Sequence, residues 1–175
     1  MKARLRPELA RGKARLPKST ATDAASAQAA VRDHEERLRA ILDTAVEGII
    51  TIDERGVIES VNPAALKMFG YTAAEVIGRN VSLLMPSPHR QEHNRYIANY
   101  CRTGQAKIIG IGRETVGQRK DGTMFPIDLA VSEVRLADRR LFTGFVRDIT
   151  ERKGLEQRQR VLFATTRALA DSNTL

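Results

Sequence analysis

The spacing of apolar residues changes from a helical period to a period of two as the chain passes residue 48. Strong helix formers fill residues 25–45, and their apolar positions form a broken helical stripe. Residues 48–62 (GIITIDERGVIESVN) then alternate apolar and polar side chains on both sides of a turn that ends in Gly56. Because successive strand residues point to opposite faces, this alternation predicts a β-hairpin directly after a helix.

Two short helices and one amphipathic helix are predicted after the hairpin. Residues 62–70 place Asn at the N-cap, Pro at the first helical position and Gly just past the end. Thr72 and Glu75 have the spacing of a capping box, in which each side chain bonds the backbone of the other residue. The prolines in residues 85–88 then interrupt the chain before the helix that carries His93.

Three alternating runs follow, at residues 107–119, 123–136 and 139–150. The turn sequences KDGT and ADRR separate them, which indicates an antiparallel meander. Two strands, several short helices and three strands predict an α+β fold. We expect a five-stranded antiparallel sheet with short helices on one face, flanked by N- and C-terminal helices.

The chain is expected to divide into four parts. Residues 1–24 are a basic arm, residues 25–45 a helix or coiled-coil linker, residues 46–150 the folded domain, and residues 151–175 a helix toward an output domain. The chain has 29 Lys and Arg against 21 Asp and Glu, a net charge of +8, and many of the cations lie in the arm. We expect a disordered arm and no nucleic-acid partner, with contact to nucleic acid or anionic lipid as the alternative.

Composition excludes several classes of protein. No apolar run approaches the roughly 18 residues of a membrane span and no secretory signal is seen, so a soluble cytoplasmic chain is expected. The single cysteine, Cys101, excludes an internal disulfide and a cysteine-based zinc cage, and three histidines support no multi-ligand metal site. Without a glycine-rich nucleotide loop or a phosphoacceptor histidine in an H-E-x-x-P setting, the chain is not expected to be an enzyme.

Four strings occur in the order of the predicted elements: VNPAALKMFGY, YTAAEVIGRN, QRKDGTMFPIDLAV and GFVRDITERK. Together they resemble a PAS domain over residues 36–153. PAS domains accommodate haem, flavin, small carboxylates or no ligand, so the fold alone does not identify the ligand. Flavin-binding photoreceptor members carry a cysteine directly after the GRN-like corner, where this chain has Val81, and Cys101 lies past the following helix. A flavin photoreceptor is therefore not predicted.

Residues 85–122 resemble the haem-binding stretch of the FixL-type oxygen sensor family, across a helix, a loop and a strand. The resemblance implies haem b, with His93 as the ligand of the iron. In that family an arginine at the position of Arg113 hydrogen-bonds bound dioxygen, and turns to a haem propionate in its absence. A guanidinium in a largely apolar pocket stabilises negative charge on dioxygen far more than it stabilises carbon monoxide. Taken alone, His93 also fits a core histidine and Arg113 a solvated strand arginine.

Other candidate site residues follow from the same resemblance. In that family, apolar residues face the distal side of the haem at the positions of Ile108, Leu129 and Val131. Further haem contacts are expected at the positions of Met85, Tyr96 and Ile97. The chain departs from the family at Asn99, where an arginine often pairs with a propionate, and Lys107 is expected to supply that charge. His89 is expected to be a capping or exposed residue rather than a metal ligand.

The sequence thus predicts a haem-binding PAS sensory module that binds dioxygen and passes the oxygen state to a two-component output, a histidine kinase with its response regulator. A homodimer through the flanking helices is expected. One alternative is a ligand-free PAS domain that serves as a dimerisation or protein-interaction scaffold. Another is a sensor of a small carboxylate held by Arg113 and Lys107. The C-terminal residues also resemble the opening of a GAF domain, which would imply a differently built signalling protein.

Overall fold

The computed structural model describes residues 20–105, 109–110 and 112–172. Most of the predicted basic arm therefore lies outside the described residues. The chain divides into two compact units, Met1–Arg39 and Ala40–Leu175. Helix α1 (Thr20–Thr44) supplies what is described of the first unit, and the sheet with the remaining helices belongs to the second. None of the described helices combines the length and the apolar character that crossing a membrane requires.

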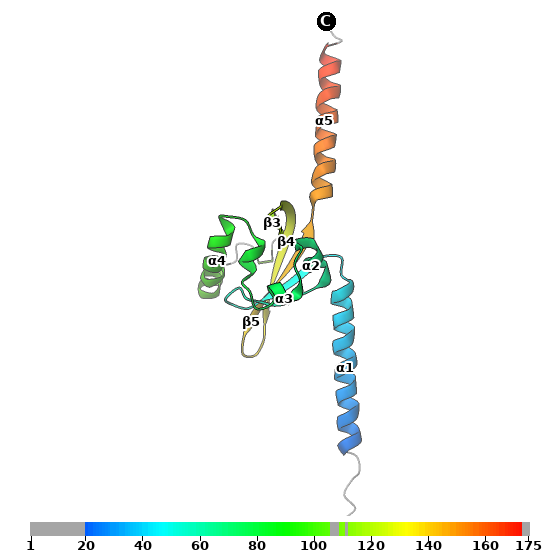
Figure 1. Cartoon of the computed structure of the whole chain (residues 1–175), viewed down its shortest axis with the longest axis vertical. Helices are drawn as coiled ribbons and strands as arrows, with labels where there is room; N and C mark the ends of the chain where they lie inside the picture. Colours follow the sequence, from blue (N-terminus) through cyan, green and yellow to red (C-terminus); the bar gives the residue numbers. More distant parts are fainter. Residues whose placement is uncertain (1–19, 106–108, 111, 173–175) are drawn as a thin grey trace, which may run out of the picture. The chain divides into compact units, whose positions relative to one another are not determined.

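The second unit is built around one antiparallel sheet of five strands (Figure 1). The strands are β1 (Gly48–Ile52), β2 (Ile58–Val61), β3 (Arg113–Gln118), β4 (Met124–Arg135) and β5 (Arg140–Asp148). Their order across the sheet is β2-β1-β5-β4-β3, so the first hairpin and the last three strands meet where β1 pairs with β5. The predicted α+β fold with a five-stranded antiparallel sheet is confirmed.

The hairpin turns use the residues that the sequence indicated. Gly56 has a φ of 80°, a left-handed conformation that favours glycine. The carboxylate of Asp53 accepts hydrogen bonds from the backbone N–H groups of Arg55 and Val57 across the same turn. Of the strand predicted at residues 107–119, the structure has β3 from Arg113 onward.

Helices lie over one face of the sheet, where their apolar residues join those of the strands in the core. They are α2 (Pro63–Phe69), α3 (Ala73–Val76), the short 3₁₀ helix η1 (Val81–Leu84) and α4 (His89–Thr103). Helix α5 (Thr150–Ser172) follows directly on β5 and is the C-terminal flanking helix (Figure 1).

The predicted caps fix the starts of α2 and α3. Asn62 Oδ1 accepts a hydrogen bond from the Ala65 N–H (3.0 Å), and Gly70 ends α2 with a φ of 76°. The Glu75 carboxylate accepts hydrogen bonds from both the backbone N–H and the hydroxyl of Thr72. Local residue types therefore set the boundaries of both helices.

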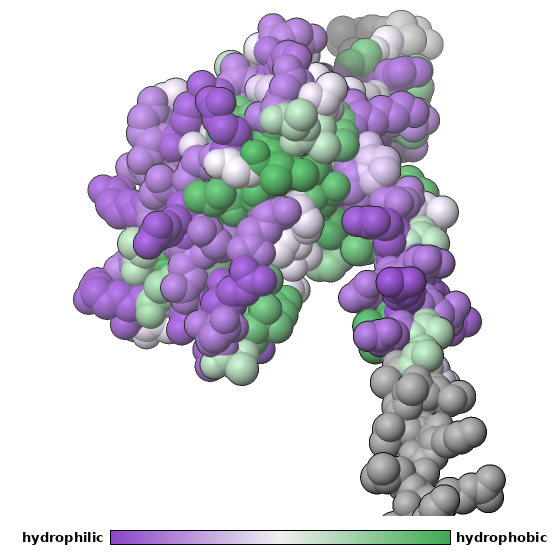
Figure 2. All heavy atoms as spheres, turned by 60° about the horizontal axis from the view of Figure 1, so that its bottom comes forward, coloured by the Kyte–Doolittle hydropathy of each residue, from purple (hydrophilic) through white to green (hydrophobic). Residues whose placement is uncertain are grey.

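An apolar core lies between these helices and the sheet. Phe69 of α2 meets Phe125 of β4 edge to face, with ring centroids 5.4 Å apart. The buried residues of the core are Ile50, Ile58, Ala65, Phe69, Val76, Val81, Leu84, Phe125, Ile127 and Val146. The molecular face in Figure 2 is mostly hydrophilic, with a hydrophobic area near its middle.

Asn62 is a buried polar side chain, 5% exposed, that joins three segments of the chain. Its Nδ2 donates to the carbonyls of Leu42 (3.1 Å) and Glu47 (2.9 Å). Its Oδ1 accepts from the Ile49 N–H (2.8 Å) in addition to that of Ala65. With four hydrogen bonds the amide is fully satisfied, so it ties the end of α1 to β1 and α2 without a desolvation penalty.

Replacing Asn62 by alanine is expected to lower the free energy of unfolding by about 2–4 kcal/mol, because two carbonyls and two N–H groups lose a buried partner. Urea unfolding of the ligand-free protein measures this loss. Asn99→Ala is the matched control: Asn99 is exposed on α4, and its replacement is expected to change stability by less than about 0.5 kcal/mol. Equal stabilities of the two variants would contradict the role of Asn62.

Candidate functional site

Helix α4 carries His93 and is fastened to the rest of the domain near both ends. Toward its start, Arg90 Nε donates to the Met85 carbonyl (2.9 Å) and Arg90 Nη2 to Gln118 Oε1 on β3 (2.8 Å). Toward its end, the hydroxyl of Tyr100 donates to the carboxylate of Glu133 on β4 (3.0 Å). These bonds limit rotation of α4 about its axis, so the helix keeps one face toward the sheet.

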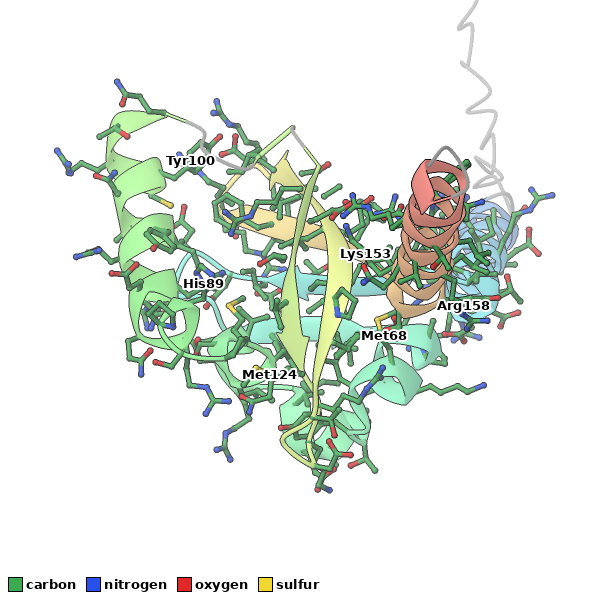
Figure 3. The ribbon with its side chains drawn as sticks, turned by 90° about the horizontal axis from the view of Figure 1, so that it is seen from above. Met68, His89, Tyr100, Met124, Lys153 and Arg158 are labelled. Atoms are coloured by element: carbon green, nitrogen blue, oxygen red, sulfur yellow. The ribbon has the colours of Figure 1, made fainter. Side chains whose placement is uncertain are left out.

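A cavity of about 310 Å³ lies between α4 and the inner face of the sheet. Ligand pockets in proteins typically measure about 300–1,000 Å³. The wall is mostly apolar and includes Ile50, Ile52, Phe69, Val81, Leu84, Met85, Ile97, Ile109, Leu129, Val131, Phe142 and Val146. The polar residues of the wall come mainly from α4 and β3: His89, His93, Tyr96, Asn99, Tyr100, Gln105, Arg113 and Thr115. Figure 3 shows His89 and Tyr100 extending from α4 toward the sheet.

The imidazole of His93 is half-buried in the wall of this cavity. Its Nδ1 atom is buried and has no hydrogen-bond partner within the described part of the chain. Burial, and secondarily the positive charge of Arg113, lowers the pKa of His93 to about 4. The ring is therefore neutral at physiological pH and offers a lone pair to a metal ion or to a hydrogen-bond donor.

Arg113 begins β3 and lines the same cavity, although its side chain is exposed. In the ladder between β3 and β4 it stands directly opposite Leu129, another residue of the cavity wall. Among the residues that the structure describes, the guanidinium has no hydrogen bond or ion pair. Arg113 therefore lies at the mouth of the cavity, available to a ligand inside.

The structure brings most of the predicted site residues to one cavity. Its wall contains His93, Tyr96, Arg113, Leu129 and Val131, together with Met85, Ile97 and Asn99. The hydroxyl of Tyr96 is bonded to Glu92, so the phenol oxygen is already engaged on the helix. Lys107 and Ile108, also predicted, lie outside the described residues.

The expected capping or exposed position of His89 is wrong, whereas its expected lack of a metal-ligand role stays a prediction. Its side chain is half-buried and lines the cavity one helical turn before His93, and Pro88 rather than His89 occupies the N-cap position. Like that of His93, its Nδ1 is buried without a hydrogen-bond partner in the described residues. The i, i+4 spacing, visible in the sequence, places both imidazoles on the same helix face.

Several residues of the cavity wall were not predicted, namely Tyr100, Thr115, Phe142 and Gly144. The ring of Tyr100 meets Phe142 edge to face, with centroids 5.8 Å apart. The signal for Phe142 and Gly144 was present in the alternation of residues 139–150, because they point inward together with the buried Val146. The helical spacing of Tyr100 from His93 places it on the same face of α4, but its partners come from strands far along the chain and no local pattern marks them.

The residues of the cavity fit a haem group. A neutral imidazole is the form of histidine that ligates iron, and a mostly apolar wall suits a porphyrin ring. The buried Nδ1 of His93 has no hydrogen-bond partner among the described residues, so this ring nitrogen is available for a further bond. A cage of protein ligands for a bare metal ion does not fit, because no group of three or more suitable side chains occurs in the described residues.

The PAS fold family model matches residues 36–149. The match covers more than half of the chain, so the chain belongs to the PAS family, whose domains are sensory modules. Sensor protein FixL of Bradyrhizobium diazoefficiens is 44% identical over 131 residues, which are 75% of this chain and 26% of that protein. The cell-division control histidine kinase PdhS of Brucella anthropi is 33% identical over 128 residues, 73% of this chain and 12% of that protein.

The chain therefore spans about a quarter or less of the length of these two relatives. Among solved structures, the PAS domain of an HTR-like protein from Haloarcula marismortui has a TM-score of 0.59 at 20% identity, covering 71% of this chain and 99% of that one. An RNA-binding light-oxygen-voltage receptor has a TM-score of 0.57 at 26% identity, covering 74% of this chain and 37% of that one. These likenesses confirm the predicted fold.

His93 in the ligand-free protein is expected to titrate near pH 4, well below its ordinary pKa of 6.5. Arg113→Ala should raise this pKa, because it removes the secondary cause, but not to 6.5, because burial remains. NMR titration of the labelled imidazole measures both values. Arg95→Ala, on the exposed side of α4, is the control and should leave the pKa unchanged. A wild-type pKa of 6.5 would contradict the buried position.

Proposed function

We propose that this chain is a haem-binding PAS sensory module that binds dioxygen and passes the oxygen state to a two-component signalling output. The observation that carries the proposal is the neutral imidazole of His93, whose Nδ1 is buried without a partner in the described residues, inside a mostly apolar cavity with Arg113 at its mouth. The relationship to sensor protein FixL and the match of residues 85–122 to the FixL-type pattern support the same assignment.

When bound, haem b supplies a ferrous iron that takes up dioxygen reversibly. His93 holds the group through its neutral imidazole, and the position of α4 fixes the direction of the ring. Arg113 would donate hydrogen bonds to the negative charge on bound dioxygen. These two residues would therefore bind the cofactor and select the gas.

The remaining site residues shape the surroundings of the cofactor in this proposal. Leu129 and Val131 would keep water from the bound group and so protect its reduced state. The same role is proposed for Ile108 on the FixL-type resemblance alone. Tyr96 contributes its ring to the wall on the side of α4. Asn99 replaces the arginine that the family often has, and on the resemblance alone Lys107 is proposed to supply the missing positive charge for a propionate.

The visible absorption spectrum tests haem binding directly. Protein prepared with haem available is expected to show a Soret band that shifts between the reduced and the oxygenated forms and is lost in His93→Ala. His89→Ala is the matched control, because it removes a cavity imidazole one turn away and should keep the band. A colourless protein that also refuses added haem would support the alternative, a ligand-free PAS scaffold. A band that persists in His93→Ala would exclude His93 as the ligand.

Arg113→Ala is expected to lower the affinity for dioxygen by about tenfold or more, the effect of losing a hydrogen bond from a charged donor. The affinity for carbon monoxide should change much less, because that ligand carries little negative charge. Gas titration of the reduced protein measures both constants. Arg113→Lys should fall between the wild type and Arg113→Ala, since it keeps the charge and loses the planar fork. Equal losses for both gases would contradict the role of Arg113.

We further propose that the sensor forms a homodimer through its flanking helices and acts on a histidine kinase with a response regulator. Leu38 and Ile41 of α1 are 49% and 58% exposed. Leu155 and Leu162 of α5, seven residues apart on one helix face, are 52% and 67% exposed, which suits packing between subunits. The names of FixL and PdhS, a sensor and a histidine kinase, support this output. In this organisation the helices at residues 25–45 and 151–175 connect the sensor at residues 46–150 to other parts.

A further inference from the structure

The first two residues of β3 point to opposite faces of the sheet. Arg113 lines the cavity, whereas the carboxylate of Glu114 meets Arg152 Nη2 (2.5 Å) and Lys153 Nζ (2.5 Å) in the first turn of α5. Figure 3 shows Lys153 on the side of α5 that faces the strands. Adjacent residues of one strand thus touch the cavity and the C-terminal flanking helix.

The two cations compensate an unfavourable position of Glu114. In the ladder of β3 with β4, Glu114 stands directly opposite Asp128, and like charges at opposed positions destabilise a sheet. The hydrogen bond from Lys153 lowers the pKa of Glu114, so this carboxylate is charged at neutral pH. If β3 separated from the start of α5, the carboxylates of Glu114 and Asp128 would face each other without the two cations. A movement of β3 that carries the start of α5 with it avoids this repulsion.

The start of α5 is also anchored to the middle of the sheet. Asp148, at the end of β5, caps the helix by accepting a hydrogen bond from the Thr150 N–H (2.9 Å). Ile149 is buried, 3% exposed, and its N–H donates to the carbonyl of Pro126 on β4 (3.1 Å). The start of α5 is therefore bonded to β5 and β4. Glu114 links it to a third strand, β3, which begins with Arg113.

We propose that Glu114 is a positioning residue that couples the state of Arg113 at the cavity to the first turn of α5. When Arg113 gains or loses a bond to a ligand in the cavity, β3 shifts and Glu114 transmits the shift through Arg152 and Lys153. The inference deepens the proposed function and rests on it in one respect, that a cavity ligand contacts Arg113. Since exposed ion pairs change equilibrium constants by up to about fivefold, coupling of that size is expected.

Hydrogen exchange of the full, ligand-free chain tests the link. Glu114→Gln is expected to speed exchange in the peptide covering residues 150–157 by up to about fivefold, because the first turn opens more often. Arg113→Ala removes the cavity-lining side chain at the start of β3 and so perturbs the strand without a ligand. It should change exchange in the same peptide in the wild-type background and have no effect in the Glu114→Gln background. That non-additivity distinguishes coupling from a purely structural loss of two ion pairs.

Glu156→Gln is the matched control. Glu156 lies 3.8 Å from both Arg152 and Lys153 but belongs to α5 itself, so its loss perturbs the same cations without touching β3. In that background the effect of Arg113→Ala on the peptide should persist. The proposal is overturned if Arg113→Ala has no effect on the peptide, or the same effect with and without Glu114. Because no haem is added, these outcomes are independent of the absorption test of haem binding.

Discussion

The pleat of the sheet decides which residues meet the cavity and which meet solvent or the flanking helix, because neighbouring strand residues point to opposite faces. On β5, Phe142 and Val146 are buried on the cavity side, while Phe145 between them is exposed on the other. The pairing of β4 with β5 sets Leu129 opposite Val146, so inward residues of adjacent strands form one continuous wall. The cavity follows from this register.

Polar bonds hold α4 over that wall. Arg90 is bonded to Gln118 of β3 near one end of the helix, and Tyr100 to Glu133 near the other. Glu133 is further fixed by Arg140, whose Nε lies 3.0 Å from its second carboxylate oxygen. Because the two ends of α4 are fixed in this way, the middle of the helix can remain at a distance from the sheet without the gap closing.

The sheet, its turns and the helix caps could be predicted because each depends on residues close together in the sequence, such as Gly56 in its turn or Thr72 with Glu75. The candidate site could not be derived from periodicity, since an inward histidine at the position of His93 fits a plain core equally well. Only the resemblance to the FixL-type pattern singled it out. The bond between Tyr100 and Glu133 joins residues 33 apart, and it exists only after β4 has found its place.

β3 lies at the edge of the sheet and, within the described residues, pairs with β4 alone. An edge strand gives up bonds on one side when it moves, whereas β1 and β5 would have to give them up on two. The strand that carries Arg113 is thus less costly to displace than the inner strands β1, β5 and β4. The open edge also invites pairing with strands of other chains, and the charged residues Arg113 and Glu114 at its start disfavour that association.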